Sequence, residues 1–298
     1  MQSRRLGKSE LDISVVGLGT WQFGGEWGYD FAQAEVNAIF DAARESGINF
    51  IDTAECYGDH LSERFVGEAI KHDRDKWIVA TKFGHHFNAF LDRDQVFGPE
   101  AVQQQLEESL KALQIDVIDL YQFHSGSNAE FDNDALWTML DKQKQAGKIR
   151  FLGISVSGRE ETNAYQTERA TQVGASAIQV IYNRLQRTPE ELVFPFCRDQ
   201  NLGVLARVPL ASGYLSGKYR VGAQFPANDV RAGHDEAQVR ETLTEVERIH
   251  REEVPDGVSM ASWALAWCLK QPIVTTVIPG CKNPEQVRQN ASAAELAL

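Results

Sequence analysis

The stretch NFIDTAECYGDH, residues 49–60, decides the fold class that we predict for this chain. It begins as a buried strand with Phe50 and Ile51, and the apolar run breaks off at Asp52. Tyr57 follows five residues later, in a tight turn. A carboxylate and a phenol at the open end of a strand are typical of barrels whose strand ends carry the chemistry.

Seven further runs along the chain have the same buried character. They are rich in Val and Ile and continuously apolar, as parallel strands covered on both faces should be. Together with NFID (49–52), the predicted strands are VVGLG (15–19), WIVATK (77–82), VIDLYQFH (117–124), FLGIS (151–155), AIQVI (177–181), GVLAR (203–207) and TTVIP (275–279).

Amphipathic segments separate the predicted strands. In residues 32–47, Val36, Ile39 and Phe40 recur at helical spacing, and Gly47 is a natural end for the helix. Further helices are predicted at 98–114, 133–148, 159–170, 189–201, 236–253 and 259–270. Eight strands alternating with helices predict a (β/α)8 TIM barrel of the α/β class, with a doubly wound sheet as the alternative.

Two segments lie outside this alternation. The opening residues, with GKSELD between RRL and ISVV, predict a small β-hairpin that caps the barrel floor. Residues 208–235 form a long glycine-rich connection, and connections of this length are usually functional or disordered. No linker or composition shift divides the sequence, so we expect a single barrel domain over residues 1–298.

The composition indicates which classes of binding partner and which cellular compartment to expect. With 30 Lys and Arg against 42 Asp and Glu, the net charge is −12, which argues against nucleic acid and an anionic membrane surface as partners. The four cysteines are scattered without a C-x-x-C pair, which favours a reducing compartment. The sequence shows no signal-peptide pattern and no apolar run of membrane-spanning length, so a cytoplasmic protein is expected.

Four polar residues mark three neighbouring predicted strand ends. Asp52 ends the second strand and Tyr57 lies on the loop after it, while Lys82 ends the third strand and His124 the fourth. In a barrel of this type these ends meet on one rim. Each residue alone is more often structural, as a packing tyrosine or a capping aspartate for example, so it is their combination that indicates a site.

These four residue types make chemical sense together. A phenol with a pKa of about 10 is a poor proton donor near neutrality, and a neighbouring ammonium is expected to lower that pKa. A carboxylate holds the ammonium charged and in place within a buried site. An imidazole beside the phenol can donate a hydrogen bond to a substrate oxygen and orient it.

The motifs that contain these residues, DTAECYG, ATKFG and LYQFH, resemble the Asp–Tyr–Lys–His tetrad of the aldo-keto reductase family. The resemblance covers nearly the whole chain and implies NADPH-dependent reduction of aldehydes or ketones to alcohols by hydride transfer. It implies Tyr57 as the proton donor, with a phenol pKa lowered by Lys82. It further implies that Asp52 holds Lys82, that His124 directs the carbonyl oxygen, and that no metal takes part.

The same resemblance implies a set of contacts to NADP(H). The residues expected at the cofactor are Gly19, Thr20, Trp21, Asp52, Ser155, Gln179, Arg207, Leu210, Gly213, Leu215, Lys218, Gly280, Lys282, Gln286 and Asn290. Ser155 and Gln179 are expected at the nicotinamide carboxamide. Lys282, with Arg288 as a second candidate cation near a 2′-phosphate, is the reason to expect NADP(H) rather than NAD(H).

Two positions depart from the family pattern. Many members have Asn after the strand-five Ser, where this chain has Val156. Many have an aromatic residue at the end of strand seven to stack on the nicotinamide, where this chain has Arg207; a guanidinium plane can stack there instead. The resemblance implies a small carbonyl compound as the substrate, and Trp21, Trp27 and the loop at 85–94 are expected to line its pocket together with Tyr57 and His124.

The sequence argues against a Rossmann nucleotide site and against a metal site. GLGTWQ fails the Rossmann G-x-G-x-x-G pattern at Gln22, and the seven histidines show no metal-ligand spacing. A nucleotide-binding regulatory or sensor subunit with little turnover, and an NAD-dependent sugar dehydrogenase, both stay open as alternatives. The sequence leaves the physiological substrate, the direction of flux and the oligomeric state undecided.

Overall fold

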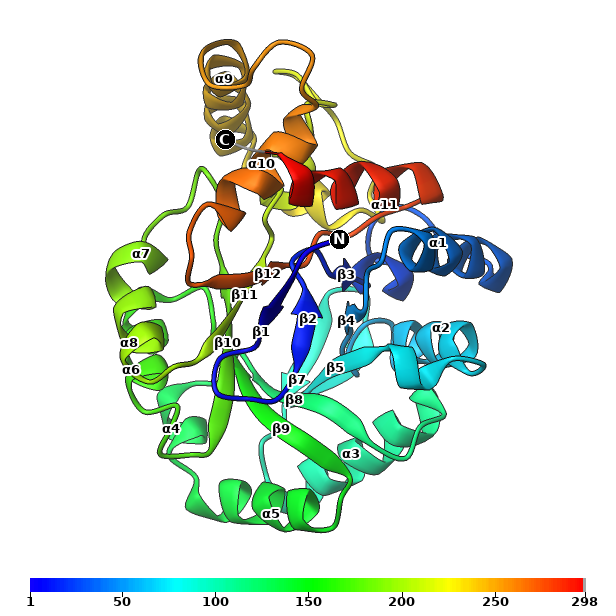
Figure 1. Ribbon diagram of the computed structural model, residues 1–298, viewed down its shortest axis with the longest axis vertical. Helices are drawn as coiled ribbons and strands as arrows, with labels where there is room; N and C mark the ends of the chain where they lie inside the picture. Colours follow the sequence, from blue (N-terminus) through cyan, green and yellow to red (C-terminus); the bar gives the residue numbers. More distant parts are fainter. Residues whose placement is uncertain (297–298) are drawn as a thin grey trace.

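Eight parallel strands form one curled sheet in the computed structural model, which describes residues 1–296 (Figure 1). In sheet order they are β12 (Val274–Val277), β11 (Gly203–Arg207), β10 (Ala175–Ile181), β9 (Ile149–Ser155), β8 (Ile118–His124), β5 (Ile78–Phe83), β4 (Phe50–Asp52) and β3 (Leu18–Gly19). The Gly17 amide donates to the Val277 oxygen at 2.8 Å, and the Val277 amide donates to the Val15 oxygen at 3.0 Å. These bonds join the two edges of the sheet, so the predicted (β/α)8 barrel is confirmed.

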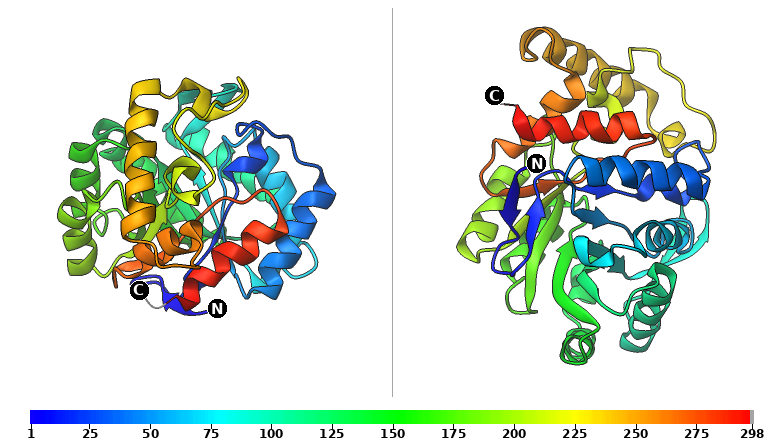
Figure 2. Two further views of the ribbon diagram at one scale, coloured as in Figure 1. Left: turned by 90° about the horizontal axis from the view of Figure 1, so that it is seen from above. Right: turned by 45° about the vertical axis from the view of Figure 1, so that its right-hand side comes forward.

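Helices follow the strands in sequence and cover the outside of the barrel (Figures 1 and 2). They are α1 (Gln33–Glu45), α2 (Leu61–Ile70), α3 (Pro99–Leu113), α4 (Asn128–Phe131), α5 (Asp134–Gln145), α6 (Glu160–Glu168), α7 (Pro189–Leu192), α8 (Phe194–Asp199), α9 (Glu236–Glu252), α10 (Met260–Leu269) and α11 (Pro284–Ala291). Single turns of tighter helix add η1 (Trp21–Gly24), η2 (Arg74–Lys76), η3 (Ala211–Ser216), η4 (Val230–Gly233) and η5 (Ser292–Glu295). The apolar positions that predict α1 from the sequence are buried against the barrel.

The N-terminal hairpin closes the barrel floor, as the sequence predicts. β1 (Ser3–Arg5) pairs with β2 (Asp12–Ser14) in antiparallel register. Leu6, Leu11 and Ile13 are buried in one apolar cluster with barrel-strand residues, namely Phe50, Ala80, Leu120, Ala177 and Leu205. The hairpin therefore seals one end of the barrel with apolar side chains.

Three of the helices, α2, α11 and the four-residue α4, lie outside the ranges predicted from the sequence. A Cβ on Gly67 in α2 would lie 2.4 Å from the Leu113 oxygen at the end of α3, so only glycine fits this helix contact, and glycine weakens the helical pattern. In α11, by contrast, the Asn283 side chain caps the Gln286 amide at 2.9 Å and Pro284 opens the first turn. These are ordinary start signals, so α11 was predictable.

Two connections near the barrel mouth are more ordered than the sequence indicates. The expected loop at 85–94 is a hairpin, in which β6 (His85–Ala89) pairs with β7 (Asp92–Gln95). The connection at 208–235 contains η3 and η4 and is fastened to the segment after β3. The Gly28 amide donates to the Asn228 oxygen at 3.0 Å, and the Val230 amide donates to the Glu26 oxygen at 2.9 Å.

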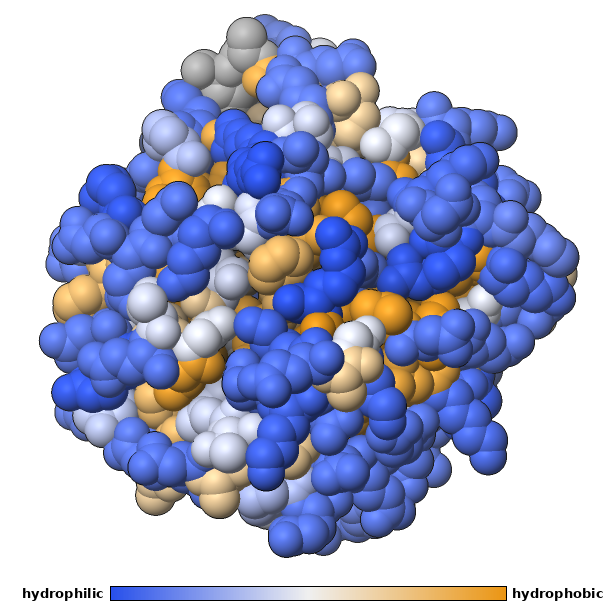
Figure 3. Space-filling view, turned by 60° about the horizontal axis from the view of Figure 1, so that its bottom comes forward, coloured by the Kyte–Doolittle hydropathy of each residue, from blue (hydrophilic) through white to orange (hydrophobic). Residues whose placement is uncertain are grey.

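Within residues 1–296, no helix is both long enough and apolar enough to cross a bilayer. The most apolar helix, α10, has ten residues, nine of which are buried. The face drawn in Figure 3 is mostly hydrophilic, with hydrophobic residues visible in small patches between the polar ones.

Candidate active site

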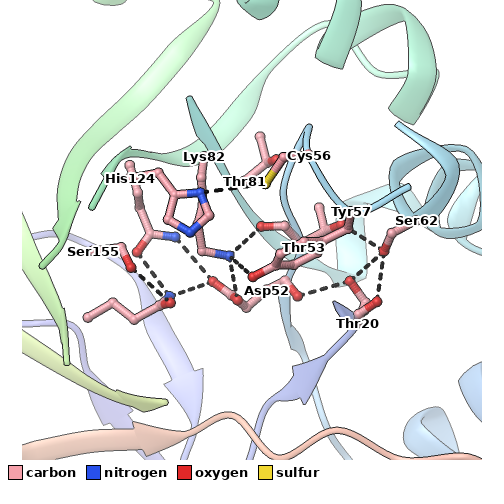
Figure 4. Close-up of polar contacts among 12 residues, drawn as sticks. Thr20, Asp52, Thr53, Cys56, Tyr57, Ser62, Thr81, Lys82, His124 and Ser155 are labelled. Atoms are coloured by element: carbon pink, nitrogen blue, oxygen red, sulfur yellow. Dashed lines mark hydrogen bonds and ion pairs between the residues drawn. The ribbon is translucent and has the colours of Figure 1, made fainter. Parts of the chain in front are cut away.

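Lys82 is the centre of a hydrogen-bonded group at the ends of β4 and β5 (Figure 4). The side chain is fully buried. Its ammonium donates to Asp52 Oδ2 at 2.8 Å, to the Thr53 oxygen at 2.6 Å and to Tyr57 Oη at 3.1 Å. The structure thus brings together three of the four residues of the predicted tetrad by direct hydrogen bonds.

Asp52 is held by two amides in addition to Lys82. Gln122 Nε2 donates to Asp52 Oδ1 at 3.1 Å, and Gln179 Nε2 donates to the same oxygen at 2.6 Å. Both carboxylate oxygens are therefore satisfied, which a buried ion pair needs in order to be stable. Sequence reasoning missed Gln122, although it lies two positions before His124 and so on the same face of β8.

A close contact between two glycines fixes the position of Tyr57. Gly58 has a φ of +67°, and a Cβ there would lie 2.7 Å from the Gly24 oxygen. The same turn is tied to Ser62, whose amide donates to the Tyr57 oxygen at 3.1 Å and whose hydroxyl donates to the Thr20 oxygen at 3.0 Å. The phenol is therefore placed by a rigid backbone turn rather than by a flexible loop.

Burial dominates the acidity of the Tyr57 phenol. Burial raises the pKa of Tyr57 to about 12, although the Lys82 ammonium acts to lower it. The prediction that Lys82 brings this pKa below its ordinary value is therefore wrong, because removing the phenolate from water outweighs the nearby positive charge. Burial also acts to lower the pKa of Lys82, but Asp52 and Tyr57 outweigh it and the pKa is raised. At neutral pH the phenol keeps its proton and the ammonium keeps its charge.

His124 lies beside the phenol and is neutral. The ring centroids of Tyr57 and His124 are 6.4 Å apart, with the rings nearly perpendicular. Nδ1 of His124 is 3.9 Å from Cys56 Sγ, and the backbone oxygen of His124 is 2.8 Å from Nε2 of His85. Burial, and next the proximity of His85 and Lys82, hold the pKa of His124 well below its usual value. A neutral imidazole can donate one hydrogen bond toward a substrate oxygen.

These pKa directions predict that carbonyl reduction is insensitive to pH between about pH 6 and pH 9. The pKa of His124 is lowered, so its ring is already neutral throughout this range. The pKa of Tyr57 is about 12, so its proton is retained throughout it. Glu55 lies within 4.8 Å of the His124 ring, and burial raises its pKa to about 8, so single-turnover rates are measured in Glu55→Gln as well as in the wild-type protein. A titration with its midpoint between about pH 6.5 and 9 that persists in Glu55→Gln would contradict the protonation state of His124 or of Tyr57.

A cavity of about 390 Å³ lies next to the tetrad. It is bordered by residues from the ends of β3, β4, β8, β10 and β11, from η3 and from α11. The predicted substrate and cofactor residues that line it are Gly19, Thr20, Trp21, Trp27, Asp52, Tyr57, His124, Gln179, Arg207, Leu210, Gly213, Lys218, Gly280, Lys282, Gln286 and Asn290. One continuous cavity therefore connects the tetrad with α11.

Two predicted residues lie behind the cavity wall. Lys82 and Ser155 are fully buried and do not line the cavity. Lys82 acts on the cavity through its bond to Tyr57, and the Ser155 hydroxyl donates to Gln179 Oε1 at 3.3 Å. Ser155 therefore positions the Gln179 amide in this structure.

Two other residues lie away from their expected places. The side chain of Leu215 is fully buried and packs in an apolar cluster with Leu243 and Val246, so it does not line the cavity. The Arg288 guanidinium pairs with Glu45 of α1 at 2.9 Å, and its side chain is 56% exposed. Arg288 does not line the cavity, so the structure gives no support to the suggestion that it provides a second cation for a 2′-phosphate.

The cavity fits a dinucleotide. Gly19 and Gly280 line it and have no side chains, so the backbone forms the wall at both positions. Close backbone approach and cationic side chains such as Lys218 and Lys282 suit phosphate groups. The Gln179 amide at the tetrad end of the cavity suits a carboxamide.

Arg231 also lines the cavity but has no recognisable signal in the sequence. Its guanidinium pairs with Asp229 at 2.6 Å and lies over the rings of Phe225, at 4.2 Å, and Trp27, at 5.3 Å. Nothing in the spacing of this lone arginine distinguishes it within residues 208–235. Only the length of that connection points to a functional role.

A (β/α)8 barrel with a buried Asp–Lys–Tyr group at its strand ends is the architecture of oxidoreductases that act on carbonyl and alcohol groups. The chain belongs to the aldo/keto reductase family, whose model matches residues 15–298. It is 34% identical to the uncharacterized oxidoreductase YqkF of Bacillus subtilis, over 99% of this chain and 91% of that protein. It is 31% identical to the NADH-specific methylglyoxal reductase of Escherichia coli, over 100% of this chain and 95% of that one. The solved structure of the glycerol dehydrogenase AKR11B4 from Gluconobacter oxydans superimposes with a TM-score of 0.85 at 29% identity, covering 100% of this chain and 91% of that chain.

Proposed function

We propose that the protein is an NADPH-dependent reductase that converts aldehydes or ketones to alcohols, with Tyr57 as the proton donor. The observation that supports this most directly is the Tyr57 phenol at the cavity wall, 3.1 Å from a fully buried Lys82 ammonium that is itself paired with Asp52 at 2.8 Å. This arrangement supplies a proton and a compensating positive charge at one point of a closed site.

In the proposed reaction the chain's own residues bind and polarise the carbonyl group. When bound, the reduced nicotinamide supplies the hydride that the carbonyl carbon receives. His124 and Tyr57 hold the carbonyl oxygen, and as negative charge develops there the Tyr57 hydroxyl gives up its proton. Lys82 stabilises the phenolate that is left, and Asp52 keeps the ammonium in place. Trp21 and Trp27, which meet edge to face with ring centroids 5.1 Å apart, border the same cavity and restrict the size of the substrate.

The proposed preference for NADPH depends on Lys282. Its side chain lines the cavity and its ammonium donates to the Trp27 oxygen at 2.7 Å. The Lys282 amide is held by Gln286 Oε1 at 2.8 Å, which fixes the start of the side chain next to α11. A bound 2′-phosphate would give the Lys282 ammonium a dianionic partner in place of the neutral Trp27 carbonyl. Charge-assisted hydrogen bonds are about twice as strong as hydrogen bonds between neutral groups.

Replacing Lys282 by Ala is expected to raise the KM for NADPH by about tenfold or more, because the charge-assisted bond to the 2′-phosphate is lost. The KM for NADH should change little, since NADH lacks that phosphate. Steady-state kinetics with both cofactors measure the difference. Arg288→Ala is the matched control, because Arg288 faces Glu45 and should alter neither value. An equal rise for both cofactors with Lys282→Ala would contradict the proposed preference.

A substrate panel tests the proposed function itself. Methylglyoxal, glyceraldehyde, dihydroxyacetone and 4-nitrobenzaldehyde would each be assayed with NADPH and with NADH, and sugars and glycerol with the oxidised forms. Reduction of at least one carbonyl compound with NADPH, faster than any oxidation at neutral pH, is the expected result. Quenching of tryptophan fluorescence by the cofactor without any turnover would favour a sensor subunit instead. Faster oxidation of sugars with NAD would favour a sugar dehydrogenase.

A further inference from the structure

Arg207 carries an unusual charge at the wall of the cavity. It is the last residue of β11, opposite Ile181 of β10, and it lines the cavity together with Tyr57. Its Nη2 donates to the Val156 oxygen at 3.1 Å, and its Nε is buried without a hydrogen-bond partner. The guanidinium is therefore only partly satisfied by the protein.

No carboxylate pairs directly with this charge, although Asp52 acts on it from a greater distance. In the described part of the chain, residues 1–296, no acidic oxygen lies within 4 Å of the Arg207 guanidinium, so it forms no salt bridge there. The other cations near the tetrad are all paired: Lys82 with Asp52 at 2.8 Å, Arg93 with Glu26 at 2.5 Å and Arg231 with Asp229 at 2.6 Å. Arginine retains its proton even in such surroundings. In the described part of the chain, the wall beside the tetrad thus has one positive charge without a salt-bridge partner.

This charge acts differently on the two redox forms of a nicotinamide. Transfer of the hydride, with its two electrons, to the substrate carbon leaves the ring with one positive charge. A guanidinium plane stacks well on a neutral aromatic ring but repels a cationic one at contact distance, most strongly where water is excluded. An aromatic side chain at the same position has the opposite preference, because its π face attracts a cation.

We propose that Arg207 makes this site bind the reduced form of its cofactor more tightly than the oxidised form. The inference builds on the proposed function, to which it adds a role for Arg207. A site of this design releases the oxidised cofactor more readily than the reduced one.

The test measures cofactor affinity rather than activity. Dissociation constants for NADPH and NADP⁺ would be determined by quenching of tryptophan fluorescence in the wild-type protein. NADPH is expected to bind at least about tenfold more tightly than NADP⁺. In Arg207→Gln and Arg207→Tyr the ratio should fall to about threefold or less, and in Arg207→Tyr mainly through tighter binding of NADP⁺. Arg207→Lys keeps the charge without the planar group and should retain most of the wild-type ratio.

Several outcomes would overturn the inference. It fails if the wild-type protein binds the two forms equally well, a measurement that needs no variant to fold. It fails also if Arg207→Gln and Arg207→Tyr keep the wild-type ratio, or if Arg207→Lys loses it as fully as Gln does. Arg150→Gln is the control for a general loss of charge, because Arg150 pairs with Asp119 at 2.7 Å on the surface at the start of β9.

The design also separates this inference from the proposed function. Repeating the measurements with NADH and NAD⁺ removes the 2′-phosphate from the comparison, and the same ratio and the same changes are expected. If none of the four nucleotides binds, the proposed function fails together with this inference. If they bind and turnover is seen, but without redox selectivity, only the role of Arg207 is wrong.

Discussion

Replacing Tyr57 by Phe is expected to lower kcat for carbonyl reduction by about a thousandfold, because the only proton donor held at the cavity wall by Lys82 is removed. Phe keeps the ring, which is packed in parallel with Trp21 at a centroid distance of 5.9 Å, so the shape of the cavity should survive. Cofactor affinity should change little. Steady-state kinetics with the best substrate of the panel and fluorescence titration with NADPH measure the two quantities.

The matched control for this change is Tyr29→Phe. Tyr29 is exposed and its hydroxyl contacts Glu35 on the surface, so the loss of that hydroxyl should leave kcat unchanged. If Tyr57→Phe retains kcat within tenfold of the wild-type value, Tyr57 is not the proton donor. A comparable loss in both variants would point to a general effect of removing a tyrosine hydroxyl.

Replacing Lys82 by Met should abolish activity and also destabilise the fold by about 3–5 kcal/mol. The change leaves the Asp52 carboxylate buried with only Gln122 and Gln179 as partners, and it removes the ammonium that counteracts the burial of the Tyr57 phenolate. Urea unfolding followed by circular dichroism measures the loss of stability. Lys71→Met is the control, because Lys71 pairs with Glu68 on the surface and such pairs contribute about 1 kcal/mol or less.

A double variant distinguishes an unpaired charge from a lost packing contact. Asp52→Asn together with Lys82→Met removes both charges, so its cost should be smaller than the sum of the two single costs by about 1 kcal/mol or more. Additive costs would show that the two side chains contribute independently. In that case the buried ion pair is not what the stability of this region depends on.

The barrel itself could be predicted because the pattern of a buried strand followed by a helix recurs many times along the chain. All the predicted strand runs contribute strand residues to the barrel, and an error in any one of them would have left the alternation of strands and helices intact. The hairpin on the floor was predictable for a related reason, since GKSELD is a turn between two short apolar runs. Boundaries were less reliable: of the run at 15–19, only Leu18–Gly19 form a regular strand.

Elements whose residues are determined by packing against a neighbouring element were harder to predict. In α2, Gly67 is required because the backbone of α3 is too close for any side chain, and glycine weakens the helical pattern. The local sequence contains no information about this contact. The hairpin at 85–95 has polar, partly exposed residues in β6 and mostly charged, exposed residues in β7, so it lacks the apolar run on which strand prediction depends. Conversely, α11 has plain start signals at Asn283 and Pro284 and was overlooked.

The residues that form the site were predictable from the sequence, but their pKa values were not. Residue types and order along the chain were enough to place Asp52, Tyr57 and Lys82 together. The balance between burial and charge depends on how much water each group loses, which only the packed structure provides, and for Tyr57 it reversed the expected direction of the pKa. Gln122 was missed because glutamine in a strand has no chemistry of its own until its partner is known.

The apolar hairpin under the barrel has a consequence for the proton that catalysis consumes. Within residues 1–296, Leu6, Leu11 and Ile13 cover the floor with apolar side chains, and Lys82 has no exposed surface. In the proposed reaction we therefore expect a phenolate formed at Tyr57 to recover its proton from the mouth, where product and cofactor would lie. Reprotonation of Tyr57 then coincides with release of the products. A product that leaves slowly should also delay reprotonation.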